Sequence, residues 1–229
     1  RIEGVVARFG GQEALFELDA WRGWLRYRQG RYAEAVELYH RAAASTTRPI
    51  RRIAHLCMAA GSGLELHALD GVERDARAAL DLLHTARHPW YESLALRALR
   101  AAAYRREEAL DPRPELVEGA ALLSASAGAG TALVEAAFAW RRGDVATARE
   151  LLAPACTPAY ARWFPSAFAL TASFLYAIGE LRGVDSEDEL LRSALEASYP
   201  GFCVQACGFL AHRRPELVRP HAAFVVAQA

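Results

Sequence analysis

The stretch from residue 29 to residue 42 constrains the fold of this chain most strongly. It reads QGRYAEAVELYHRA, which is a turn at Gly30 followed by an amphipathic helix. Ala35 and Ala42 lie two helical turns apart, with Tyr39 between them on the same face. Small residues let a neighbouring helix approach closely, and the aromatic ring fills the space beside them. A chain that repeats this pattern builds a stack of helix pairs.

The composition favours helices and a cytoplasmic protein. The chain has 229 residues, 53% of them hydrophobic, which is enough for a buried core in one domain. All 27 basic residues are Arg, Asn is absent, and the helix former Ala is abundant, which indicates a GC-rich bacterial genome. Four scattered Cys residues do not suit a disulfide-rich secreted scaffold.

The charge and the apolar runs exclude two kinds of partner. A net charge of zero argues against direct nucleic-acid binding by this region. No apolar run has the length of a membrane-spanning helix, so no membrane contact is expected. Residue 1 is Arg and Met58 is the only Met, so we expect the chain to be a fragment of a larger protein.

Apolar periodicity and turn signals predict an all-α fold. The predicted helices cover residues 13–29, 31–45, 50–69, 72–87, 88–108, 115–127, 131–142, 145–153, 157–178 and 189–198, with two more near 201–211 and 215–227. Turns are predicted at Asp70-Gly71 and at the glycine-rich residues 128–130, and Ser186 is predicted to cap the acidic helix start that follows it.

Turn residues align four copies of the opening pattern, at Gly30, Gly71, Pro114 and Gly143, which are 41, 43 and 29 residues apart. The residues five, nine and twelve positions later are Ala35, Tyr39 and Ala42; Ala76, Leu80 and Leu83; Gly119, Leu123 and Ser126; and Ala148, Leu152 and Ala155. The small–large alternation therefore recurs, with irregular spacing.

This pattern resembles the tetratricopeptide (TPR) repeat, a helix–turn–helix unit of about 34 residues. The residues on its second-helix positions are Tyr32, Ala35, Tyr39 and Ala42, and those on its small first-helix position are Gly23 and Ala136. Asp19 and Arg26 stand where that family usually has an aromatic residue. The chain therefore looks like the looser TPR-like arrays of bacterial signal-transducing transcription regulators.

The resemblance implies a right-handed α–α superhelix of about five to six antiparallel helix pairs, in a single domain over residues 1–229. Residues 13–155 carry the best-matching repeats, and residues 156–229 are expected to be divergent repeats or capping helices. A generic Ala-rich helical bundle is the alternative, since it also places small residues at helix contacts.

The strongest binding candidate is the helix predicted over residues 88–108. Its Trp90, Ser93, Arg97, Arg100 and Tyr104 are spaced three, four, three and four residues apart, so they form one stripe. In TPR-like arrays the first helix of each pair lines a concave groove. Arginines flanked by aromatic rings suit a carboxylate, a phosphate or an acidic peptide. In the alternative interpretation the rings border the core and the arginines are solvated.

A second candidate patch is Trp24, Tyr27 and Arg28, which match groove-facing positions of TPR repeats. Trp140 and Arg141 match two of these positions in the copy at Gly143. Recurrence of an aromatic residue followed by Arg favours a shared lining surface. The alternative is that both pairs end helices, where Arg interacts favourably with the helix dipole.

We find no catalytic, cofactor or metal motif. Cys203 and Cys207 lie four residues apart, with His212 nearby, but a closed zinc site needs four ligands, and Cys on an apolar helix usually belongs to the core. The sequence has no nucleophile elbow, no phosphate loop and no paired acid and base. Catalytic residues, cofactors and metals are therefore not expected.

The sequence thus predicts a non-enzymatic interaction or effector-sensing module of a bacterial regulator. Its expected partner is a protein or peptide segment, or a small acidic effector, bound in a concave helical groove. The first alternative is self-association through the apolar helices from Gly201 onward, which would form homo-oligomers. The second is an all-helical enzyme with an unrecognised site.

Overall fold

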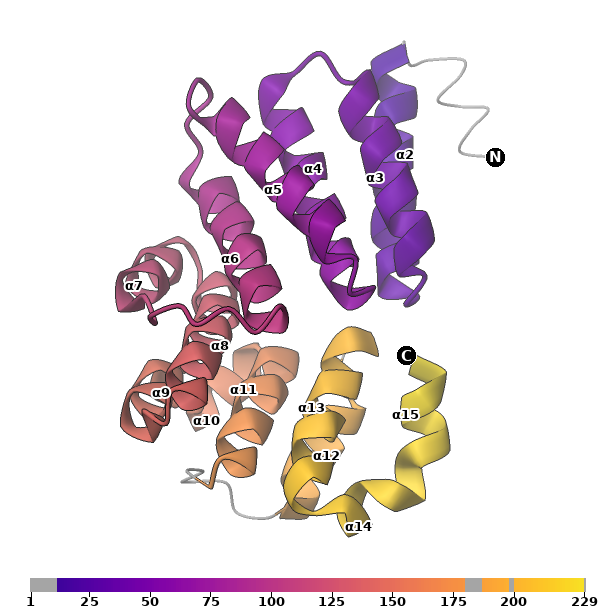
Figure 1. Ribbon diagram of the computed structural model, residues 1–229. Helices are drawn as coiled ribbons and strands as arrows, with labels where there is room; N and C mark the ends of the chain where they lie inside the picture. Colours follow the sequence, from indigo (N-terminus) through magenta and orange to yellow (C-terminus); the bar gives the residue numbers. More distant parts are fainter. Residues whose placement is uncertain (1–11, 180–186, 198–199, 229) are drawn as a thin grey trace. The chain divides into compact units, whose positions relative to one another are not determined.

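The computed structural model describes residues 12–179, 187–197 and 200–228, and Figure 1 shows the course of the chain. These ranges are helical and contain no strand, so the predicted all-α class is confirmed. None of the described helices combines the length and the apolar character needed to cross a membrane. The chain divides into two compact units, residues 1–108 and 109–229. A single repeat domain over the whole chain stays a prediction.

The first unit is a sequence of antiparallel helices joined by short turns (Figure 1). Its helices are α2 (Gln12–Arg28), α3 (Tyr32–Ser45), α4 (Pro49–Glu65), α5 (Leu69–Leu83) and α6 (Pro89–Arg105). Each of them packs on the next along the chain, and α4 also contacts α6. Helices α2 and α3 form one hairpin, and α4 and α5 form another.

The second unit contains shorter helices. They are α7 (Pro114–Leu123), α8 (Ala125–Arg141), α9 (Val145–Leu152), η1 (Ala153–Ala155), α10 (Pro158–Trp163), α11 (Pro165–Ala177), α12 (Glu187–Leu195), α13 (Pro200–Arg213), α14 (Pro215–Val218), η2 (Arg219–His221) and α15 (Ala222–Gln228). Helix α8 packs on α7 and α9, and α11 packs on α12 and α13. A core of Leu, Ala and Cys side chains lies among α11, α12 and α13.

Five helices end in the same way, and this ending defines the repeat. A residue with positive φ follows each of α2, α4, α6, α8 and α11, and these residues are Gly30, His67, Glu107, Gly143 and Gly179. At Gly30 the amide donates to the Tyr27 carbonyl at 3.0 Å, and the Arg31 amide donates to the Arg26 carbonyl at 2.9 Å. The same two bonds recur at His67, Glu107 and Gly143, so these helices share a Schellman cap. The caps are 37, 40, 36 and 36 residues apart.

These caps correct the predicted register of the second copy. The turn predicted at Asp70-Gly71 is wrong, because α5 already begins at Leu69 and the left-handed residue is His67. Counted from the cap, the residues five, nine and twelve positions later are Ala35, Tyr39 and Ala42; Val72, Ala76 and Ala79; and Ala148, Leu152 and Ala155, and all of them are buried. The repeat is therefore more regular than glycine positions indicate.

Two further predictions are wrong for local reasons. Residues 128–130 lie inside α8 and do not form a linker, and a Cβ atom at Gly128 would lie 2.9 Å from Ala121 Cα, so this glycine serves a close helix approach. The helix predicted over residues 157–178 is interrupted at Phe164, because Pro165 disfavours helical backbone in the residue before it and starts α11 anew. Ser186, the predicted cap, lies outside the described residues.

Candidate functional site

The predicted stripe of Trp90, Ser93, Arg97, Arg100 and Tyr104 lies on α6, and all five side chains are half-buried. The fully buried face of α6 consists of alanines instead, at positions 95, 98, 102 and 103. The stripe is therefore neither a solvated face nor part of the core.

Arg97 faces the first helices of the preceding hairpins. Burial lowers the pKa of its guanidinium, and Tyr27 of α2 together with Cys57 and Glu65 of α4 opposes that shift. The group stays a cation at neutral pH, since arginine titrates far above it. Within the described part of the chain, Arg97 has no hydrogen bond and no ion pair. Arg97 is thus a partly desolvated cation that pairs with no carboxylate of residues 12–179, 187–197 or 200–228.

The groups beside Arg97 are mostly neutral. Burial raises the pKa of the Cys57 thiol to about 12, although Arg97 opposes the shift. That thiol donates to the Tyr91 carbonyl at 3.6 Å. Burial, followed by Cys57, also raises the pKa of the Tyr91 phenol. Glu65 is the one carboxylate among the groups that raise the pKa of Arg97. Its charge also raises the pKa of Arg105. Glu65 thus stabilises the charged form of two arginines of α6.

Arg105 fixes α6 against α4. Its guanidinium donates to the Leu64 carbonyl in the last turn of α4, which also accepts the cap hydrogen bond from the His67 amide at 3.1 Å. Burial lowers the pKa of Arg105, as it does for Arg97. A similar hydrogen bond is present in the second unit, where the Arg213 guanidinium donates to the Tyr176 carbonyl near the end of α11 at 3.1 Å. Arg105 thus ties the end of α6 to the end of α4.

The structure separates the members of the first-helix patch. Tyr27 packs edge-on against Tyr32, with ring centroids 5.4 Å apart. Tyr27 also opposes the lowering of the Arg97 pKa. Trp24 is 42% exposed, and the Arg28 guanidinium lies 5.6 Å from the centroid of its ring. Tyr27 of α2 is therefore near enough to influence the pKa of Arg97, whereas Trp24 is exposed and pairs with the half-buried Arg28.

Trp140 and Arg141 end α8 in the second unit. Trp140 is 39% exposed and packs edge-on against Phe174 of α11 at 5.9 Å, and Arg141 is exposed. Both pairs of an aromatic residue and Arg stand three and two residues before a cap, as do Tyr104-Arg105 before Glu107. Alignment on glycines misses this third pair, because Glu107 is not a glycine.

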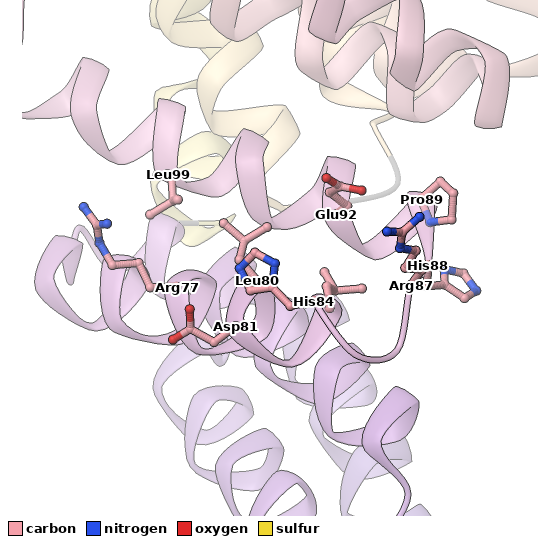
Figure 2. Close-up of a pocket in the computed structure, with 10 residues that line it drawn as sticks. Arg77, Leu80, Asp81, His84, Arg87, His88, Pro89, Glu92 and Leu99 are labelled. Carbon is pink, nitrogen blue, oxygen red and sulfur yellow. The ribbon is translucent and has the colours of Figure 1, made fainter.

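A pocket of about 840 Å³ lies between α5 and α6, and Figure 2 shows the residues around it. Its apolar lining consists of Leu80, Leu83, Leu99 and Pro89, and its titratable lining consists of Arg77, Asp81, His84, Arg87, His88 and Glu92. No residue predicted to bind a ligand belongs to it. Sequence reasoning missed the pocket because its residues come from one helix end, a turn and the next helix. Charges of both signs line it, so it favours no single class of ligand.

Two thiols of α13 belong to the core of the second unit. Cys203 and Cys207 are buried in the core with Leu190 and Leu210. Burial raises the pKa of both thiols, that of Cys207 to about 12. Among the residues that the structure describes, no three His, Cys, Asp or Glu side chains gather in a way that could hold a metal ion.

Comparisons with protein-family models, with curated proteins and with solved structures found no match for this chain. Its function must therefore be argued from its own surfaces, and the Arg97 surface of α2, α4 and α6 has the most specific chemistry.

Proposed function

We propose that the chain is a TPR-like interaction module that binds a carboxylate- or phosphate-bearing segment at the Arg97 surface. The expected ligand is an acidic peptide or a small acidic effector. One observation carries the proposal: Arg97 is a half-buried cation, without hydrogen bond or ion pair in the described chain.

The energetics favour an anion at this position. Removing a cation from water costs free energy that only a nearby opposite charge and good hydrogen bonds offset. Folding has already desolvated Arg97 in part, so an incoming carboxylate gains an interaction in a medium of low dielectric. The planar guanidinium presents paired donors that match a carboxylate or phosphate in bidentate fashion.

The proposal includes the arrangement of the helices as a TPR-like array. The recurring caps every 36–40 residues, and the close packing of Gly23 on Tyr39, support a TPR-like array over the first unit. In such an array the first helices, here α2, α4 and α6, line the concave side, which agrees with the contact between α4 and α6. A role as the sensing part of a cytoplasmic bacterial regulator rests on the resemblance in sequence.

Fluorescein-labelled hexaglutamate, with hexaglutamine as the neutral control, tests this function by fluorescence anisotropy. We expect binding to hexaglutamate that weakens as salt rises, because salt screens exposed charges. Arg97→Gln should weaken binding about tenfold or more, the scale of a lost charged hydrogen bond. The matched control is Arg87→Gln, since Arg87 is exposed and lies in the turn before α6. Equal binding of both peptides, or full binding by Arg97→Gln, overturns the proposal.

A further inference from the structure

The other arginines at the end of α6 already have partners. The Arg105 guanidinium donates to a carbonyl at the end of α4, and the Arg106 guanidinium pairs with two carboxylates of α5. Arg100 also interacts with another group of the chain. Arg97, by contrast, has no hydrogen bond and no ion pair within the described part of the chain. Its donors are therefore available to a ligand.

The arginines of α2 are engaged as well. Arg22 pairs with Asp19 at 3.5 Å, and Arg26 pairs with Glu34 of α3 at 3.2 Å. The guanidinium of Arg28 lies 5.6 Å from the centroid of an indole ring. Among the residues that the structure describes, α2 thus offers no second arginine without a partner to a ligand at the Arg97 surface.

A carboxylate at the end of α4 is near enough to influence Arg97. Glu65 is the last residue of α4 and stands two residues before the cap at His67, where three of the other four capped helices have an arginine. A negative charge at the carboxyl end of a helix opposes the helix dipole, so this position disfavours an acid. Glu65 is half-buried, and it stabilises the charged form of Arg97. The Arg97 surface thus contains a resident negative charge.

The two kinds of anion that a ligand can offer differ in charge and in the number of acceptor atoms. A carboxylate has one negative charge and two oxygens, which match the paired donors of one guanidinium. A phosphoryl group has a charge of about −1.5 to −2 at neutral pH and three acceptor oxygens, and arginine clusters bind it. One guanidinium leaves some of these oxygens without a donor. Glu65 also repels the phosphoryl group about twice as strongly as a carboxylate, because Coulomb energy is proportional to charge.

We infer that the Arg97 surface selects a carboxylate over a phosphoryl group, and that Glu65 determines this specificity. The inference rests on the proposed function and narrows its ligand to a segment with Asp or Glu side chains or to a small carboxylic acid. A surface that merely attracts negative charge would prefer the phosphoryl group, which has more of it. The arrangement of Arg97 and Glu65 predicts the opposite order.

Two fluorescein-labelled peptides of equal length test this order by fluorescence anisotropy. One consists of three Gly-Glu repeats and the other of three Gly-phosphoserine repeats, and a peptide of three Gly-Gln repeats is the neutral control. At neutral pH we expect the unaltered chain to bind the glutamate peptide about tenfold more tightly than the phosphoserine peptide, because like charges brought together weaken binding.

Substitutions of Glu65 test its role. Glu65→Gln should reduce the preference to about twofold or less, by strengthening the binding of the phosphoserine peptide more than that of the glutamate peptide. Glu65→Asp keeps the charge and should keep the preference. The matched control is Glu37→Gln, since Glu37 of α3 is exposed and its loss changes the net charge by the same amount. This control should keep the preference too, and circular dichroism should show the same helix content in all three variants.

Glutarate distinguishes the two sources of a carboxylate. Displacement of the glutamate peptide by free glutarate, at equal carboxylate concentration, identifies a small effector as the ligand, and retention of the peptide identifies a segment. Both results agree with carboxylate recognition.

Three results contradict this inference at different levels. Tighter or equal binding of the phosphoserine peptide overturns the selectivity, and it leaves the proposed function intact if Arg97→Gln loses both peptides. A preference that persists in Glu65→Gln overturns the role of Glu65. Binding of the neutral peptide as tightly as the glutamate peptide overturns the proposed function itself, and the inference with it.

Discussion

Tyr39 of α3 packs its ring directly against the backbone of α2 at Gly23, where a Cβ atom would lie 3.0 Å from Tyr39 Cε1. The ring is only 2% exposed and is packed with Ala35 and Ala59, so it has little room to move. Gly23→Val should therefore lower the free energy of unfolding by about 1–3 kcal/mol, the usual cost of overpacking. Urea denaturation followed by circular dichroism measures it.

Gly61 of α4 is the matched control for Gly23, because a Cβ atom there meets no atom within 4 Å. Gly61→Ala should raise the free energy of unfolding by about 0.5–1 kcal/mol, the helix propensity gained over glycine. Gly23→Ala should gain less than that, since its new methyl group meets the Tyr39 ring. Equal gains at the two positions would contradict the close packing.

Substitutions at two cap residues should change the stability of the fold in opposite directions. His67 adopts φ 54° with an exposed side chain, and Gly143 adopts φ 81° with open space around its missing Cβ. A side chain in left-handed backbone costs about 1–2 kcal/mol. Gly143→Ala should therefore destabilise the fold by about 1 kcal/mol, and His67→Gly should stabilise it by somewhat less, because glycine also loses more backbone entropy. Thermal melting of both variants decides the signs, and a loss of stability in His67→Gly counts against the cap.

The helices themselves could be predicted from the sequence, but their register could not be predicted everywhere. Amphipathic spacing located α2, α3 and α6 to within a few residues. Alignment on turn glycines misplaces the second copy of the repeat, because the cap hydrogen bonds hold His67 in left-handed backbone without a glycine. Gly71 and Gly128 are helical instead, because a glycine also serves helix starts and close helix approaches.

The candidate site was predictable only along single helices. Spacing on α6 indicates that Arg97 shares a stripe with Trp90 and Tyr104, and the structure keeps them on one helix. The electrostatic influence of Tyr27 on Arg97, seventy residues later in the chain, depends on how the helices pack, which no local pattern encodes. The same holds for the separation of Tyr27 from Trp24, since a shift of one helical position changes the face.

Replacing Arg97 by Leu should stabilise the fold while abolishing anion binding. Arg97 is partly desolvated and has no hydrogen bond in the described chain, so an apolar residue removes an electrostatic cost. We expect a gain of about 1 kcal/mol in the free energy of unfolding, the pattern of a site that trades stability for function. Thermal melting and hexaglutamate anisotropy on the same sample measure the two effects.

Arg105→Leu is the informative comparison for Arg97→Leu. Burial lowers the pKa of Arg105 as well, but its guanidinium donates to the Leu64 carbonyl. Its loss removes a hydrogen bond between α6 and α4, while the carbonyl keeps the His67 amide as a donor, so Arg105→Leu should destabilise the fold by about 1 kcal/mol. If both leucine variants lose stability equally, Arg97 has a structural partner and its availability to a ligand is disproved.

Alkaline pH should destabilise the fold through its buried thiols. Burial raises the pKa of Cys57 and of Cys207 to about 12, whereas an unfolded thiol titrates near 8.5. Between these values the folded chain binds more protons than the unfolded chain, so their contribution is complete below pH 8.5 and is lost as pH rises toward 12. Each thiol then lowers the free energy of unfolding by up to about 1.4 kcal/mol per pH unit.

Urea denaturation under reducing conditions at several pH values between 7 and 10.5 should show this decline. Cys57→Ala with Cys207→Ala should flatten it, because alanine does not titrate, and an equally steep decline in that variant would assign the effect to other groups.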